Sequence, residues 1–401
     1  MAQLVRTVAE GFRSTFGRDP QGVWSAPGRV SVMGDHTDLQ DGLGFGFGID
    51  RRTAVAVATR TDGRITVATD LTPERAEAEL ATLSPDAGME DWKAYPLGMI
   101  WSVLDHAREN PPARLQDGPD EAVFLGTGLD VFLSTELPIG GGLSSSASIC
   151  AALGTALSDL WELELTHQTL ARLGQQAETH AAGAQTGRAD HIFSLCSKES
   201  KDVFYDARGD DVSVIDVPDL PGAKLVSVVV NTREPHRNWS DAFAERRRAC
   251  ERAAAELGCQ TLREVKLSEL EAKAGELDET TFRRARHVIT EISRVLELTR
   301  TLRTDGPGAI AELLDQSHAS LRDDYGVSTD RIELTVDLAR HLGASGARLT
   351  GSGMGGSVFC LMPEGTEGRL REMLAEAYAE HGWEAPEVFV VESAEGARRD
   401  V

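Results

Sequence analysis

The sequence predicts an α+β protein built from two domains. Its 401 residues exceed what one hydrophobic core usually supports. Helical and strand-like periodicities follow one another without the strict strand–helix alternation of a Rossmann fold or a TIM barrel. A hydrophobic fraction of 41% and a charged fraction of 26% are ordinary for a soluble globular protein. We place a domain boundary near residue 210, which gives domains 1–210 and 211–401.

The first half of the chain begins with a helix and then alternates between strands and helices. Val5, Val8, Phe12 and Phe16 recur near helical spacing, which predicts a helix over residues 1–16. A proline-rich segment at 111–125 is expected to be a loop. The apolar patterns predict strands at 30–33, 53–58, 66–69 and 129–133, and helices at 91–109, 145–162 and 167–182.

The second half turns helical and then alternates again. Strands are expected at 203–206 and 224–231. Apolar positions at intervals of three and four residues then predict helices at 242–257, 281–302, 309–321 and 332–341. The chain closes with predicted strands at 347–350, 357–362 and 387–391 and a helix at 367–381.

Charge and cysteine content exclude several classes of partner and site. The net charge of −23 argues against broad binding to nucleic acid or to an anionic membrane, because both need a basic face. A nucleotide can still bind where backbone amides and a metal ion offset its phosphates locally. Five scattered cysteines without C-x-x-C spacing make a zinc site or a disulfide framework unlikely. With no signal peptide or membrane-length apolar run, we expect a cytoplasmic protein.

One stretch near the beginning of the chain is unusually dense in polar side chains. After a Pro27-Gly28 turn come Arg29, a short apolar run, and then Asp35, His36, Thr37 and Asp38. Ordering so many polar groups beside a strand is costly unless a ligand uses them. This stretch is therefore a candidate ligand site.

A glycine- and serine-rich stretch has the order of a phosphate-binding loop. Gly140, Gly141 and Gly142 let the backbone approach a ligand closely, and the serines that follow fall where a helix begins. The N–H groups and positive dipole end of that helix favour an anion, most naturally a polyphosphate. It is not a Walker A loop, because no lysine follows the glycines as that pattern requires.

Two further stretches are informative mainly through their context. Gly351, Gly353 and Gly356 formally satisfy the dinucleotide fingerprint, but a strand rather than a helix follows them, so we expect a glycine hairpin. Asp190 follows a predicted helix end and two glycines. Taken alone, such an aspartate is more often a helix cap than a catalyst.

Together these motifs resemble those of galactokinases, members of the GHMP superfamily that also contains homoserine, mevalonate and phosphomevalonate kinases. The resemblance covers nearly the whole chain, including 246–250, 284–291 and 317–325. It implies a ribosomal-protein-S5-like N-terminal domain and a ferredoxin-like C-terminal domain with the active site between them. The His36-Thr37-Asp38 block disfavours a mevalonate kinase.

The resemblance also implies a role for individual residues. Asp190 would accept the proton of a sugar hydroxyl, while Arg29 keeps it ionised and offsets charge on the transferred phosphoryl group. Sugar binding falls on Asp35, His36, Thr37, Asp38, Gly187 and Phe243. ATP phosphates would lie against Gly140, Gly141, Gly142, Leu143, Ser144, Ser145 and Ser146. Ser146 and Glu178 would ligate Mg²⁺.

The activity expected from this resemblance is ATP-dependent phosphorylation of galactose at its 1-hydroxyl, which gives galactose 1-phosphate and ADP. We expect the protein to be a monomer or a weak homo-oligomer. Several positions depart from the family pattern. Asp35 replaces a Glu, Leu39 and Phe243 each replace a Tyr, and Arg188 stands in a segment that is usually Cys-Gly-Ile-Met. A related substrate therefore stays open, such as arabinose, or galacturonate paired with Arg188. A non-catalytic sugar and nucleotide sensor is a further alternative.

Three segments keep two interpretations each. Blocks 284–291 and 317–325 look specific to galactokinases, but charge-rich helix faces are commonly solvated or part of an interface. Trp92 and Tyr95 match an aromatic pair near the adenine pocket of the family, with core packing as the alternative.

Overall fold

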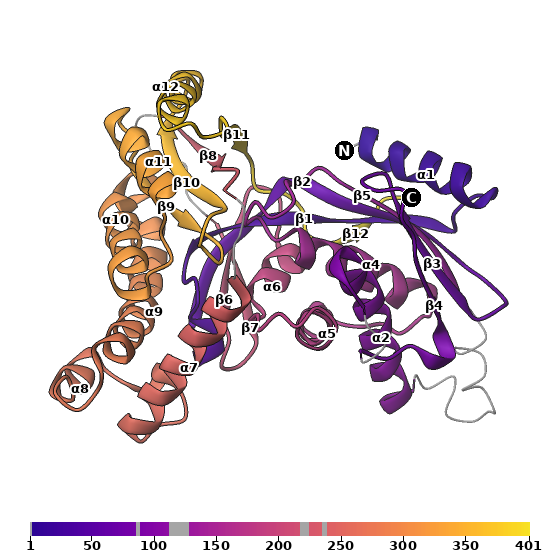
Figure 1. Cartoon of the computed structure of the whole chain (residues 1–401), viewed down its shortest axis with the longest axis horizontal. Coiled ribbons are helices and arrows are strands. Elements are labelled where there is room, and N and C mark those ends of the chain that lie inside the picture. Colours follow the sequence, from indigo (N-terminus) through magenta and orange to yellow (C-terminus); the bar gives the residue numbers. More distant parts are fainter. Residues whose placement is uncertain (1, 86–88, 112–127, 217–223, 235–238) are drawn as a thin grey trace.

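The computed structural model describes residues 2–85, 89–111, 128–216, 224–234 and 239–401. Two β-sheets with helices packed against them lie side by side, one formed mainly by the N-terminal half of the chain and one by the C-terminal half (Figure 1). The predicted α+β class is confirmed. The loop predicted at 111–125 lies, apart from Pro111, outside the described residues.

The first sheet has eight strands within the described residues. Its main path runs β12 (Arg398–Arg399), β1 (Gly22–Met33), β2 (Leu43–Thr59), β5 (Leu129–Thr135), β3 (Arg64–Thr69), β4 (Ala76–Glu79). The beginning of β2 also pairs with β6 (Asp202–Asp206), which pairs with β7 (Asp211–Ile215). Neighbouring strands are antiparallel except for β3 and β5. The sheet therefore recruits strands from both ends of the chain.

Successive side chains of β2 point to opposite faces of the sheet and pack against helices on both faces. Val55 and Val57 pack toward the helices on one face, whereas Ala54 and Ala56 pack toward the single helix α1 (Ala2–Phe16) on the other. The first layer, below the sheet in Figure 1, consists of α2 (Ala94–Glu109), α4 (Ser145–Leu160), α5 (His167–His180) and α6 (Ala189–Cys196). Short 3₁₀ turns at Asp38–Gln40, Leu80–Thr82 and Asp91–Lys93 complete this half.

The second sheet is antiparallel, in the order β11 (Glu387–Val391), β8 (Leu225–Asn231), β10 (Ser357–Pro363), β9 (Gly346–Thr350). Its helices are α7 (Trp239–Leu257), α8 (Leu267–Ala272), α9 (Glu279–Asp305), α10 (Ala311–Ser320), α11 (Asp330–His341) and α12 (Glu367–Glu380). A π-helical turn at Leu321–Tyr325 follows α10, and 3₁₀ turns lie at Leu262–Glu264 and Pro307–Ile310.

One apolar core joins the two halves. Val30 and Phe47 from the first sheet belong to the same buried cluster as Val229 and Phe359 from the second. The rings of Phe47 and Phe359 meet edge to face with centroids 6.3 Å apart. Because the interface is a shared core, side chains from both halves can be held in fixed positions at one site.

The structure corrects the sequence-based assignment at several places. Pro27 and Gly28 do not form a turn but lie inside β1, at a register shift between Pro27 and Arg29. A bulge of this kind tolerates the missing N–H of proline inside a strand. Five short helices and strands among the described residues were not predicted, because they are too short for a clear periodicity: β4, α6, β7, α8 and β12.

A buried arginine fastens the C-terminal tail to the first sheet, and this generates a prediction about stability. Arg52 is fully buried and donates to the carbonyl oxygens of Ser25, Glu395 and Gly396 at 3.0, 2.5 and 2.8 Å.

Replacing Arg52 by Leu leaves these oxygens without their donor and should lower the free energy of unfolding by about 3 kcal/mol. Thermal unfolding measures the loss, with exposed Arg64→Leu on β3 as the control. Equal midpoints for the two variants would contradict the fastening role.

Candidate active site

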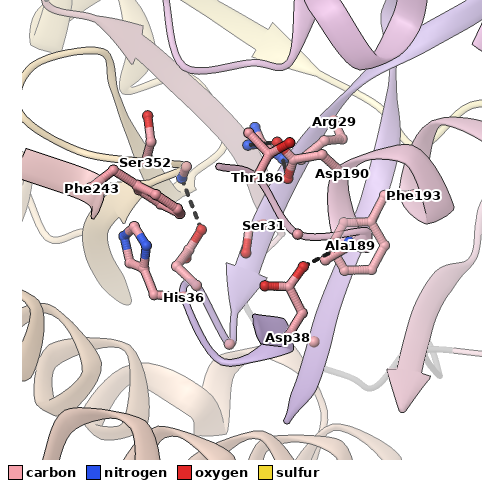
Figure 2. A pocket seen from close by; sticks show the side chains of 15 residues that line it. Arg29, Ser31, His36, Asp38, Thr186, Ala189, Asp190, Phe193, Phe243 and Ser352 are labelled. Carbon is pink, nitrogen blue, oxygen red and sulfur yellow. Dashed lines mark hydrogen bonds and ion pairs between the residues drawn. The ribbon is translucent and has the colours of Figure 1, made fainter. Parts of the chain in front are cut away.

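Two adjoining cavities meet at a pair of oppositely charged side chains. A smaller cavity of about 70 Å³ lies toward the second half of the molecule, and a larger one of about 460 Å³ lies over the glycine- and serine-rich loop. Both are lined by Arg29, Thr186, Asp190 and Ser352. Figure 2 shows the smaller cavity, with Arg29 and Asp190 facing one another at its edge. A group bound in either cavity would therefore contact this charged pair.

Arg29 and Asp190 come from different elements and form a two-pronged ion pair. The Arg29 Nε donates to Asp190 Oδ1 at 2.8 Å, and Nη2 donates to Oδ2 at 2.9 Å. The remaining terminal nitrogen, Nη1, donates to the carbonyl oxygen of Gly142 at 2.6 Å. The Arg29 side chain is 3% exposed, whereas that of Asp190 is 40% exposed. The carboxylate is thus held rigidly and still reaches the cavities.

Asp190 is kept in its ionised form. Burial by itself raises the pKa of Asp190. The positive charge of Arg29 and the hydrogen bonds donated by Arg29 and by the Ser144 hydroxyl lower it by more, so the pKa lies below the usual value. The Ser144 hydroxyl donates to Asp190 Oδ2 at 2.5 Å. Asp190 is therefore an available proton acceptor at neutral pH.

The glycine- and serine-rich loop presents backbone to the larger cavity, as predicted. Gly140 and Gly142 adopt positive φ angles of 69° and 73°, which glycine adopts without strain. Ser144 has φ 56° at the N-cap of α4, which begins at Ser145 as the sequence predicted. Loop residues Gly140, Gly142, Ser144, Ser145 and Ser146 line the larger cavity. An anion there would lie at the positive end of the α4 dipole.

Glu178 is a buried carboxylate with one unused oxygen. Its residue is 3% exposed, Oε2 accepts a hydrogen bond from the Thr186 hydroxyl at 2.7 Å, and Oε1 has no hydrogen-bond partner among the residues that the structure describes. Burial raises the pKa of Glu178, but the His191 imidazole and the hydroxyls of Ser146 and Thr186 outweigh it, so the pKa lies below its usual value. An ionised, under-coordinated oxygen beside a phosphate loop fits a divalent cation.

Ser146 and Glu178 line the same cavity, so the structure brings the two predicted metal ligands together. The described residues contain no group of three or more His, Cys, Asp or Glu side chains that could hold a metal on their own. Mg²⁺ usually takes only one or two carboxylates from a protein and completes its coordination with phosphate oxygens and water.

The smaller cavity contains most of the residues predicted to bind a sugar. Asp38 Oδ2 accepts a hydrogen bond from the backbone N–H of Ala189 at 3.0 Å (Figure 2). A Cβ atom added to Gly187 would lie 1.8 Å from the same oxygen, so only glycine fits there. The absence of a side chain at Gly187 therefore leaves the space that the Asp38 carboxylate occupies. The two residues are far apart in the sequence, and no local motif indicates that they meet.

Aromatic rings form another part of the wall. The His36 ring stacks on Tyr325 with centroids 4.4 Å apart and meets Phe243 at 5.5 Å. His36 is buried, and within the described part of the chain its Nε2 has no hydrogen-bond partner. Burial together with nearby His287 lowers its pKa well below the usual value. A neutral imidazole with an unsatisfied nitrogen is suited to a hydroxyl group of a ligand.

Two residues singled out from the sequence do not line the smaller cavity. Thr37 is fully buried, and its hydroxyl donates to the carbonyl oxygen of Leu43 at 2.6 Å, so it holds the loop rather than facing a ligand. Arg188 donates to Asp210 Oδ2 at 2.5 Å, and Asp210 also accepts from the Tyr205 hydroxyl. The guanidinium of Arg188 is thus committed to another partner.

Beneath the smaller cavity lies a buried polar network that the sequence did not predict. Asp35 accepts hydrogen bonds from Arg348 Nη2 at 2.5 Å and from the backbone N–H of Gly351 at 3.0 Å. Glu291 and His287 of α9 bind the backbone of Gly34 and Asp35. The local signal was Arg348 itself, an arginine between the apolar residues Ala347 and Leu349 of a predicted strand.

Blocks 284–291 and 317–325 are therefore not simply solvated faces. His287, Glu291, Ser317 and His318 are each fully buried. Ser317 donates to Glu291 Oε1 at 2.7 Å, which joins α10 to α9 below the cavity. Further lining residues that the sequence analysis missed are Ser31, Gly34, Gly44 and Phe193.

The far end of the larger cavity is apolar. Trp92 and Tyr95 line it and also pack against the core of the first half, so the core-packing interpretation is confirmed, and a position beside adenine stays a prediction. Leu71 and Ile139, which are 51% and 71% exposed, lie at the same cavity. The cavity thus joins an anion-binding loop to a surface suited to an aromatic base.

Family models match three parts of the chain. The GHMP kinases N terminal domain matches residues 100–198, and the GHMP kinases C terminal matches 299–380. The galactokinase galactose-binding signature matches residues 10–59, which contain Arg29 and the Asp35–Asp38 segment.

Full-length relatives agree with these matches. A galactokinase of Streptomyces coelicolor is 37% identical over 397 residues, which cover 98% of both chains. One of Mycobacterium tuberculosis is 33% identical over 93% of this chain and 98% of the relative. The crystal structure of Lactococcus lactis galactokinase complexed with galactose superposes with a TM-score of 0.87, at 25% identity and 98% and 99% coverage. Mevalonate kinase of Methanococcus jannaschii, at 18% identity and a TM-score of 0.61, shares the fold.

The contact between Ser144 and Asp190 leads to a prediction about pH. Replacing Ser144 by Ala removes a hydrogen bond to the ionised carboxylate, so the pKa of Asp190 should rise toward its ordinary value. Because that pKa is lowered on folding, the stabilisation it provides is present above the unfolded-state pKa and is lost as the pH falls through the folded-state pKa. Carbon-13 NMR titration of the Asp190 carboxyl measures the change, with Ser145→Ala as the control. An unchanged pKa in the Ser144 variant would contradict the assignment.

Proposed function

The chain belongs to the galactokinases, a family of the GHMP kinases, and from that premise we propose that it transfers the γ-phosphoryl group of ATP to the 1-hydroxyl of galactose at Asp190. The observation that carries the proposal is the Arg29–Asp190 pair at the junction of two cavities. Sugar would occupy the smaller cavity and ATP the larger one. The acceptor hydroxyl and the phosphoryl group would then meet beside one carboxylate.

Asp190 is proposed as the proton acceptor. The anomeric oxygen attacks the γ-phosphorus, its proton passes to the Asp190 carboxylate, and the bond between γ-phosphorus and the bridging oxygen breaks to release ADP. Arg29 holds Asp190 ionised in the folded protein and brings a positive charge next to the transferred group. Its third contact, to the Gly142 carbonyl, ties this charge to the phosphate loop.

The phosphate loop and the N-terminus of α4 are proposed to hold the triphosphate of ATP. Five residues of this loop line the cavity with backbone and short hydroxyl side chains, namely Gly140, Gly142, Ser144, Ser145 and Ser146, whereas Leu143 is buried. Ser146 and Glu178 would hold Mg²⁺, which when bound offsets the charge of the phosphates. Such local compensation is needed in a chain whose net charge is −23.

On the sugar side, we propose that Asp38 and His36 bind hydroxyl groups, that Gly187 leaves room for Asp38, and that Phe243 supplies an apolar wall. Thr37 then acts by holding the loop. Galacturonate becomes less favourable as a substrate, since Arg188 is committed to Asp210 and Arg29 to Asp190. A pure sensor is also disfavoured, because it would need neither a poised proton acceptor nor a metal-binding carboxylate.

We also propose a division of the chain into two domains near residue 210, with β7 and β12 extending the first sheet from beyond that boundary.

No helix in the described part of the chain combines the length and the apolar character that a membrane crossing requires. Five free cysteines, four of them buried, support a reducing cytoplasm as the compartment. A monomer or weak homo-oligomer suffices, because one chain supplies both cavities.

A sugar panel with MgATP tests the proposal directly. Galactose should give the fastest ADP release, arabinose less, and galacturonate least. Replacing Asp190 by Asn removes the proton acceptor and should lower kcat with galactose about 10³-fold while both ligands still bind. Asp210→Asn, outside the cavities, is the matched control and should keep most of the turnover.

Two outcomes would overturn this reading. Turnover of galacturonate equal to or faster than that of galactose would replace the proposed substrate. Absence of ADP release with every sugar, despite nucleotide binding, would favour the sensor.

The metal ligands give a separate prediction. Glu178→Gln keeps an acceptor for the Thr186 hydroxyl but loses the charge, so the Mg²⁺ concentration for half-maximal activity should rise about tenfold or more. Magnesium titration at saturating ATP and galactose measures this, and exposed Glu164→Gln should behave as the unaltered enzyme. If Glu178→Gln has the magnesium dependence of the control, Glu178 is not a ligand.

A further inference from the structure

We propose that Asp35 is a positioning residue which fastens the glycine hairpin 351–356 against the phosphate loop, instead of serving mainly as a sugar ligand. The inference rests on the proposed function for the identity of the two ligands. It assigns to Asp35 an effect on nucleotide binding that a sugar ligand would not have.

Asp35 is already engaged through both carboxylate oxygens. Oδ2 accepts from Arg348 Nη2 at 2.5 Å and Oδ1 accepts from the Gly351 backbone N–H at 3.0 Å. Arg348 is fully buried, and its Nη1 donates to the carbonyl oxygens of Ser31 and Val32 at 3.1 and 2.8 Å. A fully buried guanidinium requires a compensating charge, so this ion pair constrains where the Asp35 side chain can lie.

The backbone at Asp35 is fixed from the opposite side by α9. Glu291 Oε1 accepts from the Gly34 backbone N–H at 3.0 Å, and His287 Nε2 lies 3.2 Å from the Asp35 carbonyl oxygen. Glu291 is also bound by the Ser317 hydroxyl and by Arg294. With its backbone held by α9 and its side chain held by β9, Asp35 bridges two elements of the second half.

The hairpin that Asp35 holds is in close contact with the phosphate loop. A Cβ atom on Gly351 would lie 2.6 Å from the Gly142 carbonyl oxygen and 3.2 Å from Arg29 Nη2, so the backbones meet there with no space for a side chain. At the other end of the hairpin, the Ser357 hydroxyl donates to the Gly141 carbonyl oxygen at 2.5 Å. Gly141 and Gly142 are therefore positioned by residues far along the chain.

These contacts form one continuous path. It runs from α9 through Asp35 to Gly351, then to Gly142, whose carbonyl accepts from Arg29. A hairpin released from Asp35 would shift against the loop proposed to hold the triphosphate. Nucleotide affinity should therefore depend on Asp35 even when no sugar is present.

Asp38 provides the matched comparison. It lies in the same loop and lines the same cavity, but its carboxylate accepts a hydrogen bond from the backbone of Ala189 at the start of α6, and the described residues show no hydrogen bond between Asp38 and the hairpin. A change from aspartate to asparagine there should weaken sugar binding without altering nucleotide binding. Ser357→Ala interrupts the path at its other end and removes no charged group.

The test is calorimetric binding of a non-hydrolysable ATP analogue with Mg²⁺, in the absence of sugar, to the full chain. Asp35→Asn and Ser357→Ala should each bind about tenfold more weakly than the unaltered protein, the size of one lost hydrogen bond of this kind. Asp38→Asn should bind the analogue normally. Thermal unfolding of each variant identifies loss of fold, and Ser357→Ala carries the test if Asp35→Asn does not fold.

Normal analogue binding by a folded Asp35→Asn or by Ser357→Ala would overturn the inference, particularly if Asp35→Asn raised only the KM for galactose. Equal weakening by Asp38→Asn would overturn it as well. Absence of analogue binding to the unaltered chain would instead contradict the proposed function, so the two failures are distinguishable.

Discussion

The ion pair between Arg29 and Asp190 is the interaction on which the rest of the site depends. A carboxylate that must stay ionised beside a polyanion needs a fixed positive partner, and Arg29 supplies one through two parallel hydrogen bonds. The bulge in β1 after Pro27 precedes the arginine, and Ser144 and Gly142 complete its surroundings. The fold therefore brings a strand, a loop and a short helix together at one charge pair.

The sequence was sufficient for features that arise locally. The glycine turn before α4, the start of α4 and the hairpin between β9 and β10 follow from glycine content and from short-range periodicity, and they were predicted correctly. Phosphate binding by the loop stays a prediction. The α+β class, the galactokinase family and ATP-dependent sugar kinase activity were confirmed as well. The domain boundary and the individual site roles stay predictions.

Features that depend on distant partners could not be predicted. Asp35 and Arg348 are separated by 313 positions, and nothing in either neighbourhood indicates the other. Arg188 looked available for a ligand because its partner Asp210 lies in a turn between two strands that the sequence only partly revealed. Thr37 belongs to a polar motif, yet its hydroxyl satisfies a backbone carbonyl, which only the folded path of the loop determines.

The central claim is that one carboxylate serves both cavities, and a crystal structure with galactose and a non-hydrolysable ATP analogue bound together tests it most directly. We expect the anomeric oxygen within hydrogen-bonding distance of Asp190, about 2.6–3.2 Å, on the side facing the γ-phosphate in the larger cavity. A sugar whose anomeric oxygen points away from Asp190, or a triphosphate bound away from the Gly140–Ser146 loop, would contradict the account.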